Sequence, residues 1–369
     1  MTNPKTPILQ FGTSRFLQAH ADTFIDAAMK EGQNVGPVTV VQSSGDAARA
    51  GRVRALVRPE GYPVRIRGLE NGAEIGRTLT VNSLRRGLST AADWDEIVRI
   101  FRDEATHVIS NTADRGFDPQ PADVARVFDQ AMSYPAKLQL LLRARFAAGG
   151  EPLAILPTEL IERNGDVLKA RVLELAGQDD PAYAAWLRDN VIWANSLVDR
   201  IVSEPIEPAG AVAEPYALWA IEAAPGVVPP CQHPAIRLVE TLESAEALKL
   251  FILNLGHTYM TDNWLKNPQG TESVRDYLAI DTVRRDLLDL YEKEVIPGFE
   301  AAGAGDEARV YAATTLDRFG NPFLFHRLAD IAGNHEQKIA RRIGAFLGWS
   351  RANGGTQETP RLSAIVAES

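Results

Sequence analysis

The stretch Pro7-Ile-Leu-Gln-Phe11-Gly12-Thr-Ser-Arg15 decides the fold. Its first five residues have the apolar character of a buried strand, and residues 16–30 carry apolar side chains at helical spacing. A strand, a glycine-containing turn and a helix in direct succession are the setting in which dinucleotide fingerprints occur. The stretch therefore predicts the first βα unit of an α/β domain.

The same alternation continues through the first half of the chain. Further strands are predicted at residues 37–42, 107–110 and 153–156, and helices at residues 93–104 and 135–147. Residues 62–67 and 77–81 have the pattern of a hairpin inserted into the series. This order predicts a Rossmann-like, doubly wound and mostly parallel sheet.

The second half has a different character. From about Leu238, apolar spacing predicts helices over residues 240–264, 274–291 and 335–349. A chain of 369 residues exceeds one ordinary core, so two domains are expected. We predict a Rossmann-like domain over residues 1–237 and a mostly α-helical substrate and catalytic domain over 238–369. The Pro- and Gly-rich residues 225–234 are the best candidate for the linker.

Charge and composition exclude several classes of function. The net charge of −9 argues against general binding to nucleic acid or to anionic membranes. Cys231 is the only cysteine, so neither an intrachain disulfide nor a thiolate zinc cluster can form, and no metal site is expected. No apolar run is long enough to span a membrane and no signal segment is visible, which favours a cytoplasmic protein. The oligomeric state stays open.

The turn after the first strand is a degenerate dinucleotide fingerprint. Gly12 is present, but Ser14 stands where the second glycine would be. Serine is small enough to let a pyrophosphate approach the N–H groups at the helix start, and Arg15 adds positive charge. The candidate cofactor-binding residues are Gly12, Thr13, Ser14, Arg15 and Phe16, although an ordinary strand-to-helix turn would read the same way.

The end of the second predicted strand bears on the choice of cofactor. NAD-binding domains normally place an acid there to bind the adenosine ribose. Here the strand ends in Gln42-Ser43-Ser44, and Asp46 follows only later, with Arg49 and Arg52 nearby. Gln42 and Ser43 are therefore candidate cofactor contacts, and the absence of a strand-end acid leaves room for a 2′-phosphate. We expect NAD, with NADP possible.

The segment Lys249-Leu-Phe-Ile-Leu-Asn254-Leu-Gly-His257 holds the strongest catalytic candidates. On an α-helix, offsets of five and eight residues correspond to about 140° and 80° after whole turns, so the three polar side chains can lean to one side. The apolar flanks predict a lysine with a lowered pKa that acts as a general base. An amide and an imidazole can then hold a reacting oxygen. A solvated lysine and a helix-bracing Asn-x-x-His remain the plain alternative.

Taken together, short motifs along the chain resemble the polyol-specific long-chain dehydrogenases, the mannitol dehydrogenase family, and are closest to its tagaturonate and fructuronate reductases. They occur in the family's order over roughly residues 7–345. They are Ile8-Leu-Gln-Phe-Gly12-Thr-Ser-Arg-Phe16, Ser110-Asn111-Thr112, Ser133-Tyr-Pro-Ala-Lys137, Glu159-Leu-Ile-Glu-Arg-Asn164-Gly165, Val198-Asp-Arg-Ile201, Lys249-x4-Asn254-x2-His257, Arg318-Phe-Gly-Asn-Pro322 with His326, and Asn334 with Lys338.

The resemblance implies metal-independent hydride transfer between a nicotinamide cofactor and a small sugar acid or polyol. It implies that Lys249 is the acid/base and that Asn254 and His257 polarise the reacting oxygen. It adds Asn111 and Thr112 to the cofactor contacts. The substrate contacts that it suggests are Glu159, Asp199, His326 and Lys338, and Arg342 lies one turn after Lys338, where the two could hold a carboxylate.

These features favour an NAD(P)-dependent reductase of a keto sugar acid. A polyol or polyol-phosphate dehydrogenase is the alternative within the family. Two other classes stay open from the residues alone, namely a Schiff-base enzyme such as an aldolase built on Lys249, and a non-catalytic protein that senses a sugar or a nucleotide.

Overall fold

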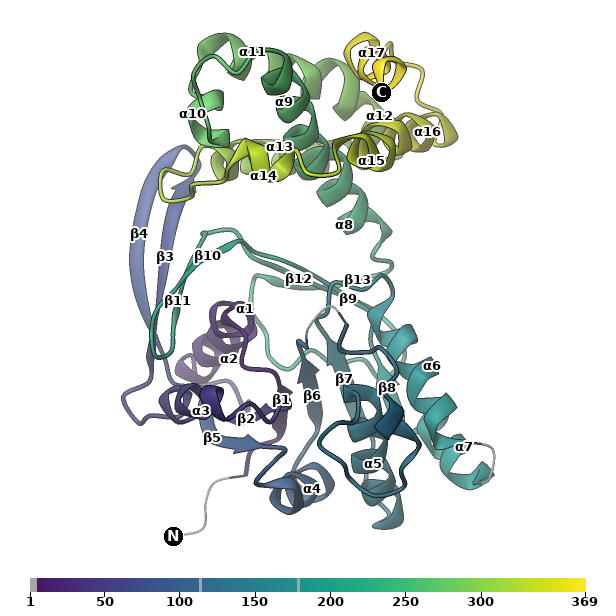
Figure 1. Cartoon of the computed structure of the whole chain (residues 1–369). Coiled ribbons are helices and arrows are strands. Elements are labelled where there is room, and N and C mark those ends of the chain that lie inside the picture. The colour runs from purple at the N-terminus through teal and green to yellow at the C-terminus, as the bar shows by residue number, and fades with distance from the viewer. Residues whose placement is uncertain (1–4, 113–114, 178–179) are drawn as a thin grey trace. The chain divides into compact units, whose positions relative to one another are not determined.

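The computed structural model describes residues 5–112, 115–177 and 180–369, and within these ranges nothing is described of the Ala48 side chain. The chain forms two compact units (Figure 1). Unit 1 comprises Met1–Ile66, Arg77–Ala213 and Ala217–Leu242, and unit 2 comprises Arg67–Gly76, Glu214–Tyr216 and Glu243–Ser369. Two short excursions of the N-terminal half therefore belong to unit 2. Each unit is described by itself.

Unit 1 is built on a six-stranded parallel sheet with strand order β5-β2-β1-β6-β7-β8. Its strands are β1 (Ile8–Phe11), β2 (Val38–Gln42), β5 (Leu84–Ser89), β6 (His107–Ser110), β7 (Leu153–Pro157) and β8 (Val191–Trp193). The chain runs outward from β1 to β2 and β5, then crosses to the other side of β1 for β6, β7 and β8. This order is that of a doubly wound Rossmann domain, with its switch point between β1 and β6.

Apolar composition explains why these strands are central. Every residue of β1, β2 and β7 is buried, as expected for parallel strands that are covered on both faces. The helical segments of unit 1 are α1 (Arg15–Ala19), α2 (Ala21–Lys30), η1 (Ala47–Arg49), α3 (Ala50–Leu56), α4 (Trp94–Asp103), η2 (Pro121–Val124), α5 (Tyr134–Ala147), α6 (Asn164–Ala176) and α7 (Pro181–Asp189).

The remaining strands form two smaller sheets. One has the order β10-β11-β3-β4 and the other β13-β12-β9. Their strands are β3 (Tyr62–Glu70), β4 (Ala73–Val81), β9 (Ser196–Asp199), β10 (Val202–Pro205), β11 (Ala211–Ala213), β12 (Leu218–Glu222) and β13 (Ile236–Val239). The tip of the β3–β4 hairpin, Arg67–Gly76, is one of the excursions into unit 2.

The structure differs from the sequence-based prediction in several local features, among them the edge strands β5 and β8, which were not predicted. The helix predicted over residues 16–30 is broken at His20, whose non-helical backbone separates α1 from α2. The hairpin strands extend beyond the predicted residues 62–67 and 77–81. The predicted linker, residues 225–234, connects β12 to its parallel neighbour β13 inside unit 1.

Unit 2 is helical, apart from the hairpin tip. Its α-helices are α8 (Glu243–Leu248), α9 (Leu255–Lys266), α10 (Val274–Leu278), α11 (Asp281–Leu290), α12 (Ile296–Ala301), α13 (Gly305–Phe319), α14 (Leu328–Ile331), α15 (His335–Lys338), α16 (Ala345–Ala352) and α17 (Pro360–Glu368). Three π-helical segments interrupt them: η3 (Lys249–Asn254), η4 (Tyr291–Val295) and η5 (Ile339–Gly344). No helix within the described ranges is both long enough and apolar enough to cross a membrane.

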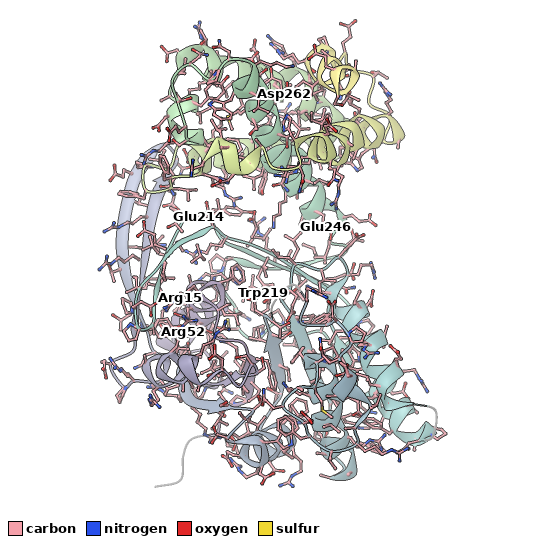
Figure 2. The ribbon with its side chains drawn as sticks, in the orientation of Figure 1. Arg15, Arg52, Glu214, Trp219, Glu246 and Asp262 are labelled. Carbon is pink, nitrogen blue, oxygen red and sulfur yellow. The ribbon has the colours of Figure 1, made fainter. Side chains whose placement is uncertain are left out.

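A buried ion pair ties the excursions of unit 2 to its helices. Arg318 of α13 donates two hydrogen bonds to the Glu214 carboxylate, from Nη2 at 2.9 Å and from Nε at 3.0 Å. Both side chains are almost fully buried, and the guanidinium also lies over the Tyr216 ring. On the same helix, the Asp317 carboxylate accepts the backbone N–H of Gly72 in the hairpin tip. Glu214 is labelled in Figure 2.

Asp22 makes the stability of unit 1 depend on pH. Its side chain is fully buried on α2, and the Tyr62 hydroxyl donates a hydrogen bond of 2.8 Å to its carboxyl oxygen. Burial raises the pKa of Asp22 to about 7. The folded state therefore retains a proton that the unfolded chain loses above about pH 4, so stability falls between about pH 4 and 7, by up to about 4 kcal/mol.

We expect Asp22→Asn to flatten this dependence, because its neutral amide cannot ionise. Urea unfolding at pH 4.5, 6 and 7.5 measures the slope, and Asp306→Asn, at a fully exposed carboxylate, is the control. A variant that loses as much stability over this range as the wild type would show that another group titrates.

Candidate active site

The turn after β1 requires glycine. Gly12 has a φ of 129°, and a Cβ at this position would lie 2.5 Å from the carbonyl oxygen of Asn111. Only a residue without a side chain allows the end of β1 to approach the end of β6 so closely. Gly12 thus brings together the two strands that flank the switch point, which is where ligands bind in open α/β sheets.

Ser14, Asn111 and Thr158 form a hydrogen-bonded chain across the carboxyl ends of β1, β6 and β7. The Ser14 hydroxyl accepts the Leu17 N–H as the N-cap of α1 and donates to the Asn111 side-chain oxygen at 2.8 Å. The Asn111 amide donates in turn to the backbone and side-chain oxygens of Thr158, at 3.1 and 3.2 Å. The serine that replaces the second glycine therefore serves as a helix cap and fixes Asn111.

Glu159 lies in the same region and is 4% exposed. Its two carboxylate oxygens accept hydrogen bonds from the Ser110 hydroxyl and from the backbone N–H and hydroxyl of Thr112, at 2.9 to 3.1 Å. Burial raises the pKa of Glu159, and these hydrogen bonds oppose the rise. The structure thus brings Glu159 together with Thr112, a predicted cofactor contact. The nearby Arg163 forms an ion pair of 2.6 Å with Asp166.

The remaining residues of the first turn are held by local contacts. The Thr13 carbonyl accepts the Gln18 side-chain amide, and the Phe16 ring stacks on His20 with ring centres 4.6 Å apart. Arg15 forms an ion pair of 2.6 Å with the exposed Glu207. Burial is the main reason that the pKa of Arg52 is lowered, and the charge of Arg15 is the second. Both arginines are labelled in Figure 2. Positive charge therefore gathers beside α1.

The end of β2 borders a cleft of about 270 Å³ in unit 1. Ser43, Ser44 and Thr112 line it together with Lys137 and Arg115. Gln42 does not reach toward the cleft, because its amide donates to the Asp46 carbonyl at 2.6 Å within its own loop. Arg49 pairs with Asp46 at 3.3 Å. The cations that face Ser43 across this cleft are therefore not the arginines that the sequence suggested.

Lys137 also lines this cleft, although it was not among the cofactor contacts predicted from the sequence. It is 4% exposed and donates to the carbonyl oxygens of Ser43 and Gln130, at 3.1 and 2.9 Å. Burial lowers its pKa to about 8. Its motif, Ser133-Tyr-Pro-Ala-Lys137, was visible in the sequence, but only the fold shows that α5 carries this lysine to the end of β2.

In unit 2, the predicted catalytic lysine lies in π-helical η3 rather than in a regular α-helix. In a π-helix each hydrogen bond joins residues that are five apart in the chain. Lys249 and Asn254 are five apart, so their side chains lie closer to the same face of the helix than α-helical spacing suggested. Both side chains are half-buried, and the carboxamide of Asn254 has no hydrogen-bond partner among the described residues. His257 follows in the first turn of α9.

His257 is an uncharged imidazole at neutral pH. It is 7% exposed, and burial holds its pKa well below the usual range. His326, Arg318, Arg342 and Lys338 lower the pKa further by their charge. The centre of its ring lies 4.3 Å from the centre of the Phe319 ring and 4.9 Å from the centre of the His326 ring. A neutral imidazole still carries one N–H group, which can donate a hydrogen bond to a substrate oxygen.

His326 and Lys338 belong to the same group of side chains. Burial lowers the pKa of both, and Lys338 donates one hydrogen bond of 2.6 Å to the Ile331 carbonyl. Arg342, one turn further, donates to the Thr258 hydroxyl at 3.0 Å and to the Asn254 carbonyl at 3.4 Å. Arg342 is thus bound to the helical segment that carries Asn254 and Thr258, whereas Lys338 is held by the Ile331 carbonyl.

Asp199 lies in unit 1, at the end of β9. It is 6% exposed and its charge acts on His20, whose Nε2 donates a hydrogen bond of 2.9 Å to the Leu218 carbonyl oxygen. Its neighbour Arg200 donates to the Ala19 carbonyl. The role of Asp199 as a substrate contact stays a prediction. Over the ranges that the structure describes, no three His, Cys, Asp or Glu side chains are grouped to hold a metal ion.

Two family models match the chain, one after the other. The mannitol dehydrogenase Rossmann domain matches residues 6–229, and the mannitol dehydrogenase C-terminal domain matches residues 241–368. An altronate oxidoreductase of Bacillus subtilis (strain 168) is 30% identical over 362 residues, covering 91% of this chain and 73% of that protein. One from Klebsiella pneumoniae subsp. pneumoniae is 30% identical over 98% of this chain and 78% of its own length.

Two solved structures share the fold. A D-sorbitol dehydrogenase in substrate-free form superposes with a TM-score of 0.79 at 20% identity, over 94% of this chain and 76% of that one. The mannitol 2-dehydrogenase of Pseudomonas fluorescens, solved with NAD and D-mannitol, gives a TM-score of 0.72 at 17% identity, over 99% and 78%. At this identity the likeness is one of fold.

Proposed function

The chain belongs to the mannitol dehydrogenase family and is an oxidoreductase, and from this premise we propose that it reduces a keto sugar acid to the corresponding hydroxy acid with a nicotinamide dinucleotide. Unit 1 binds the dinucleotide at the carboxyl ends of β1, β2 and β6. Unit 2 supplies the groups that act on the substrate. The altronate oxidoreductases among its relatives support the sugar-acid class.

In the proposed reaction, the residues of unit 2 handle the proton and the developing charge. A nicotinamide dinucleotide held by unit 1 would supply the hydride that the carbonyl carbon accepts. The electron pair of the C=O bond moves to oxygen, and the Lys249 ammonium transfers a proton to that oxygen to give the alcohol. Asn254 and His257 donate hydrogen bonds to the same oxygen while it carries negative charge. In the oxidative direction, neutral Lys249 takes the proton back.

The observation that carries this proposal is the side-chain group around His257. The carboxamide of Asn254 and the imidazoles of His257 and His326 have no hydrogen-bond partners among the described residues, although all three are buried or half-buried. Largely buried side chains whose polar atoms remain open to hydrogen bonding are the kind of convergent polar groups that orient a ligand in a pocket. Lys338 beside them favours an anionic substrate, as a sugar acid is, over a neutral polyol.

The test is a screen of keto sugar acids and of polyols with reduced and oxidised forms of both cofactors, read by the absorbance of the reduced nicotinamide. We expect turnover of keto sugar acids and weak or no oxidation of neutral polyols. Faster oxidation of a polyol would replace the sugar-acid assignment with a polyol dehydrogenase. Trapping of a substrate adduct by borohydride at Lys249 would indicate Schiff-base chemistry instead.

The cleft at the end of β2 leads to a prediction about cofactor preference. It presents Ser43 rather than a carboxylate and places the Lys137 ammonium beside it. We therefore expect NAD to be used, with NADP accepted as well, because no acid at Ser43 repels a 2′-phosphate. Ser43→Asp should reduce the kcat/KM for NADP by about tenfold or more relative to NAD, which corresponds to about 1.4 kcal/mol.

Steady-state kinetics with both cofactors in wild type and Ser43→Asp measures this ratio, and Ser203→Asp in β10 is the control for an added charge. A wild type that already excludes NADP would assign the discriminating role to another acid, such as Asp46.

A further inference from the structure

The π-helical form of η3 is supported by side chains from two other helical segments. The Tyr291 hydroxyl, from η4, donates a hydrogen bond of 2.9 Å to the Ile252 carbonyl inside η3. Arg342, from η5, donates to the Asn254 carbonyl at the end of η3. Each of the three π-helical segments of unit 2 thus contributes to one junction. π-Helical turns within α-helices are rare and occur often at functional sites.

Tyr291 reaches Ile252 only because residue 256 is glycine. A Cβ on Gly256 would lie 2.0 Å from the Tyr291 hydroxyl oxygen and 3.1 Å from the Phe319 ring. Gly256 lies between Asn254 and His257, on the helix that carries both. The glycine therefore opens the one approach by which the phenol contacts the backbone of η3.

The Tyr291 phenol is a permanent donor. It is 1% exposed, and burial raises the pKa of Tyr291, so the hydroxyl keeps its proton at neutral pH. Its hydrogen bond to a backbone carbonyl is independent of the rotamer of any surface side chain.

We propose that Tyr291 is a positioning residue, which holds η3 in its π-helical form through the Ile252 carbonyl and so keeps Lys249 and Asn254 aligned with His257. This inference rests on the proposed function of Lys249. A return of η3 to α-helical hydrogen bonding would shift the register by one residue and rotate Lys249 by about 100° relative to His257. Misplacement of a catalytic group by about 1 Å is enough to cost up to about a hundredfold in rate.

Tyr291→Phe removes the hydroxyl and keeps the ring. We expect kcat to fall about tenfold or more, the pH profile of kcat to shift, and the dissociation constant of the dinucleotide to stay unchanged, because unit 1 is untouched. Amide hydrogen exchange over residues 249–256 should become faster. Gly256→Ala should have the same effects, since its methyl group displaces the intact phenol.

Tyr183→Phe is the matched control. Tyr183 is fully buried in unit 1 and its hydroxyl donates to the Gln139 carbonyl at the same distance, 2.9 Å. Loss of the Tyr183 hydroxyl should lower the melting temperature about as much as loss of the Tyr291 hydroxyl does. It should leave kcat, the pH profile of kcat and amide exchange at residues 249–256 unchanged. Gly348→Ala, on an open face of α16, is the control for the glycine substitution.

The inference is overturned if Tyr291→Phe keeps the wild-type kcat, pH profile and amide exchange while it loses stability as Tyr183→Phe does. The exchange measurement needs no substrate. If amide exchange over residues 249–256 rises in Tyr291→Phe while Lys249→Ala retains full turnover, Tyr291 still holds η3 in place. In that case only the proposed role of Lys249 fails.

Discussion

Replacing Lys249 by alanine should lower kcat by about 10²–10⁴-fold and leave the dissociation constant of the dinucleotide nearly unchanged. The reason is that Lys249 lies in η3 of unit 2, whereas the predicted dinucleotide contacts lie in unit 1. Lys249→Arg should be almost as slow, because arginine keeps the positive charge but cannot release a proton in this range. Together the two variants separate proton transfer from simple charge attraction.

The measurements are steady-state kcat over a range of pH and equilibrium binding of the dinucleotide by fluorescence. Lys266→Ala is the control on the adjoining helix α9, since Lys266 is half-exposed and its ammonium pairs with the buried Asp262 and the exposed Glu368. Wild-type turnover by Lys249→Ala would remove the lysine from the mechanism. Full activity in Lys249→Arg alone would indicate an electrostatic role without proton transfer.

Glu214→Gln should destabilise the protein by about 3–5 kcal/mol, because it leaves the buried Arg318 guanidinium without its carboxylate. The side chains of Arg318 and Glu214 are only 3% and 2% exposed, so water cannot replace the lost charge. The expected result is a lower urea midpoint for the transition of unit 2. Glu204→Gln, at an exposed position in β10, should change stability by less than about 0.5 kcal/mol.

The double variant Glu214→Leu with Arg318→Met tests whether the cost lies in the unpaired charge. Apolar residues can replace a buried ion pair at little or no cost, so the double variant should be more stable than either single change. Equal losses in the single and double variants would mean that the shape of this contact, including the Tyr216 ring over Arg318, matters more than its charge.

Much of unit 1 could be predicted from the sequence, because its signals are local. Residues 7–16 already contain a buried strand and a glycine turn, and the apolar runs that follow predicted a mostly parallel sheet, although the strands β5 and β8 at its two edges were not predicted. The catalytic candidates were also readable, since Lys249, Asn254 and His257 lie within nine residues on one helix. The residue types and their spacing are enough to suggest such a group.

Other features depend on contacts between residues that are distant in the chain. α5 brings Lys137 against Ser43, a separation of 94 residues, and Tyr291 meets Ile252 over 39 residues. No local pattern encodes these pairs. The sequence favoured Arg49 as a phosphate partner, but in the fold it pairs with Asp46, three residues before it.

The sequence by itself therefore determined the class of each unit and the glycine turn, and it supplied the candidates for the reacting groups, because hydrophobic periodicity and residue chemistry are properties of neighbouring residues. Only the tertiary structure decided the π-helical form of η3, the neutral state of His257 and the buried pair of Glu214 with Arg318. These follow from burial and from side chains supplied by other helices, and both arise only when the chain is folded.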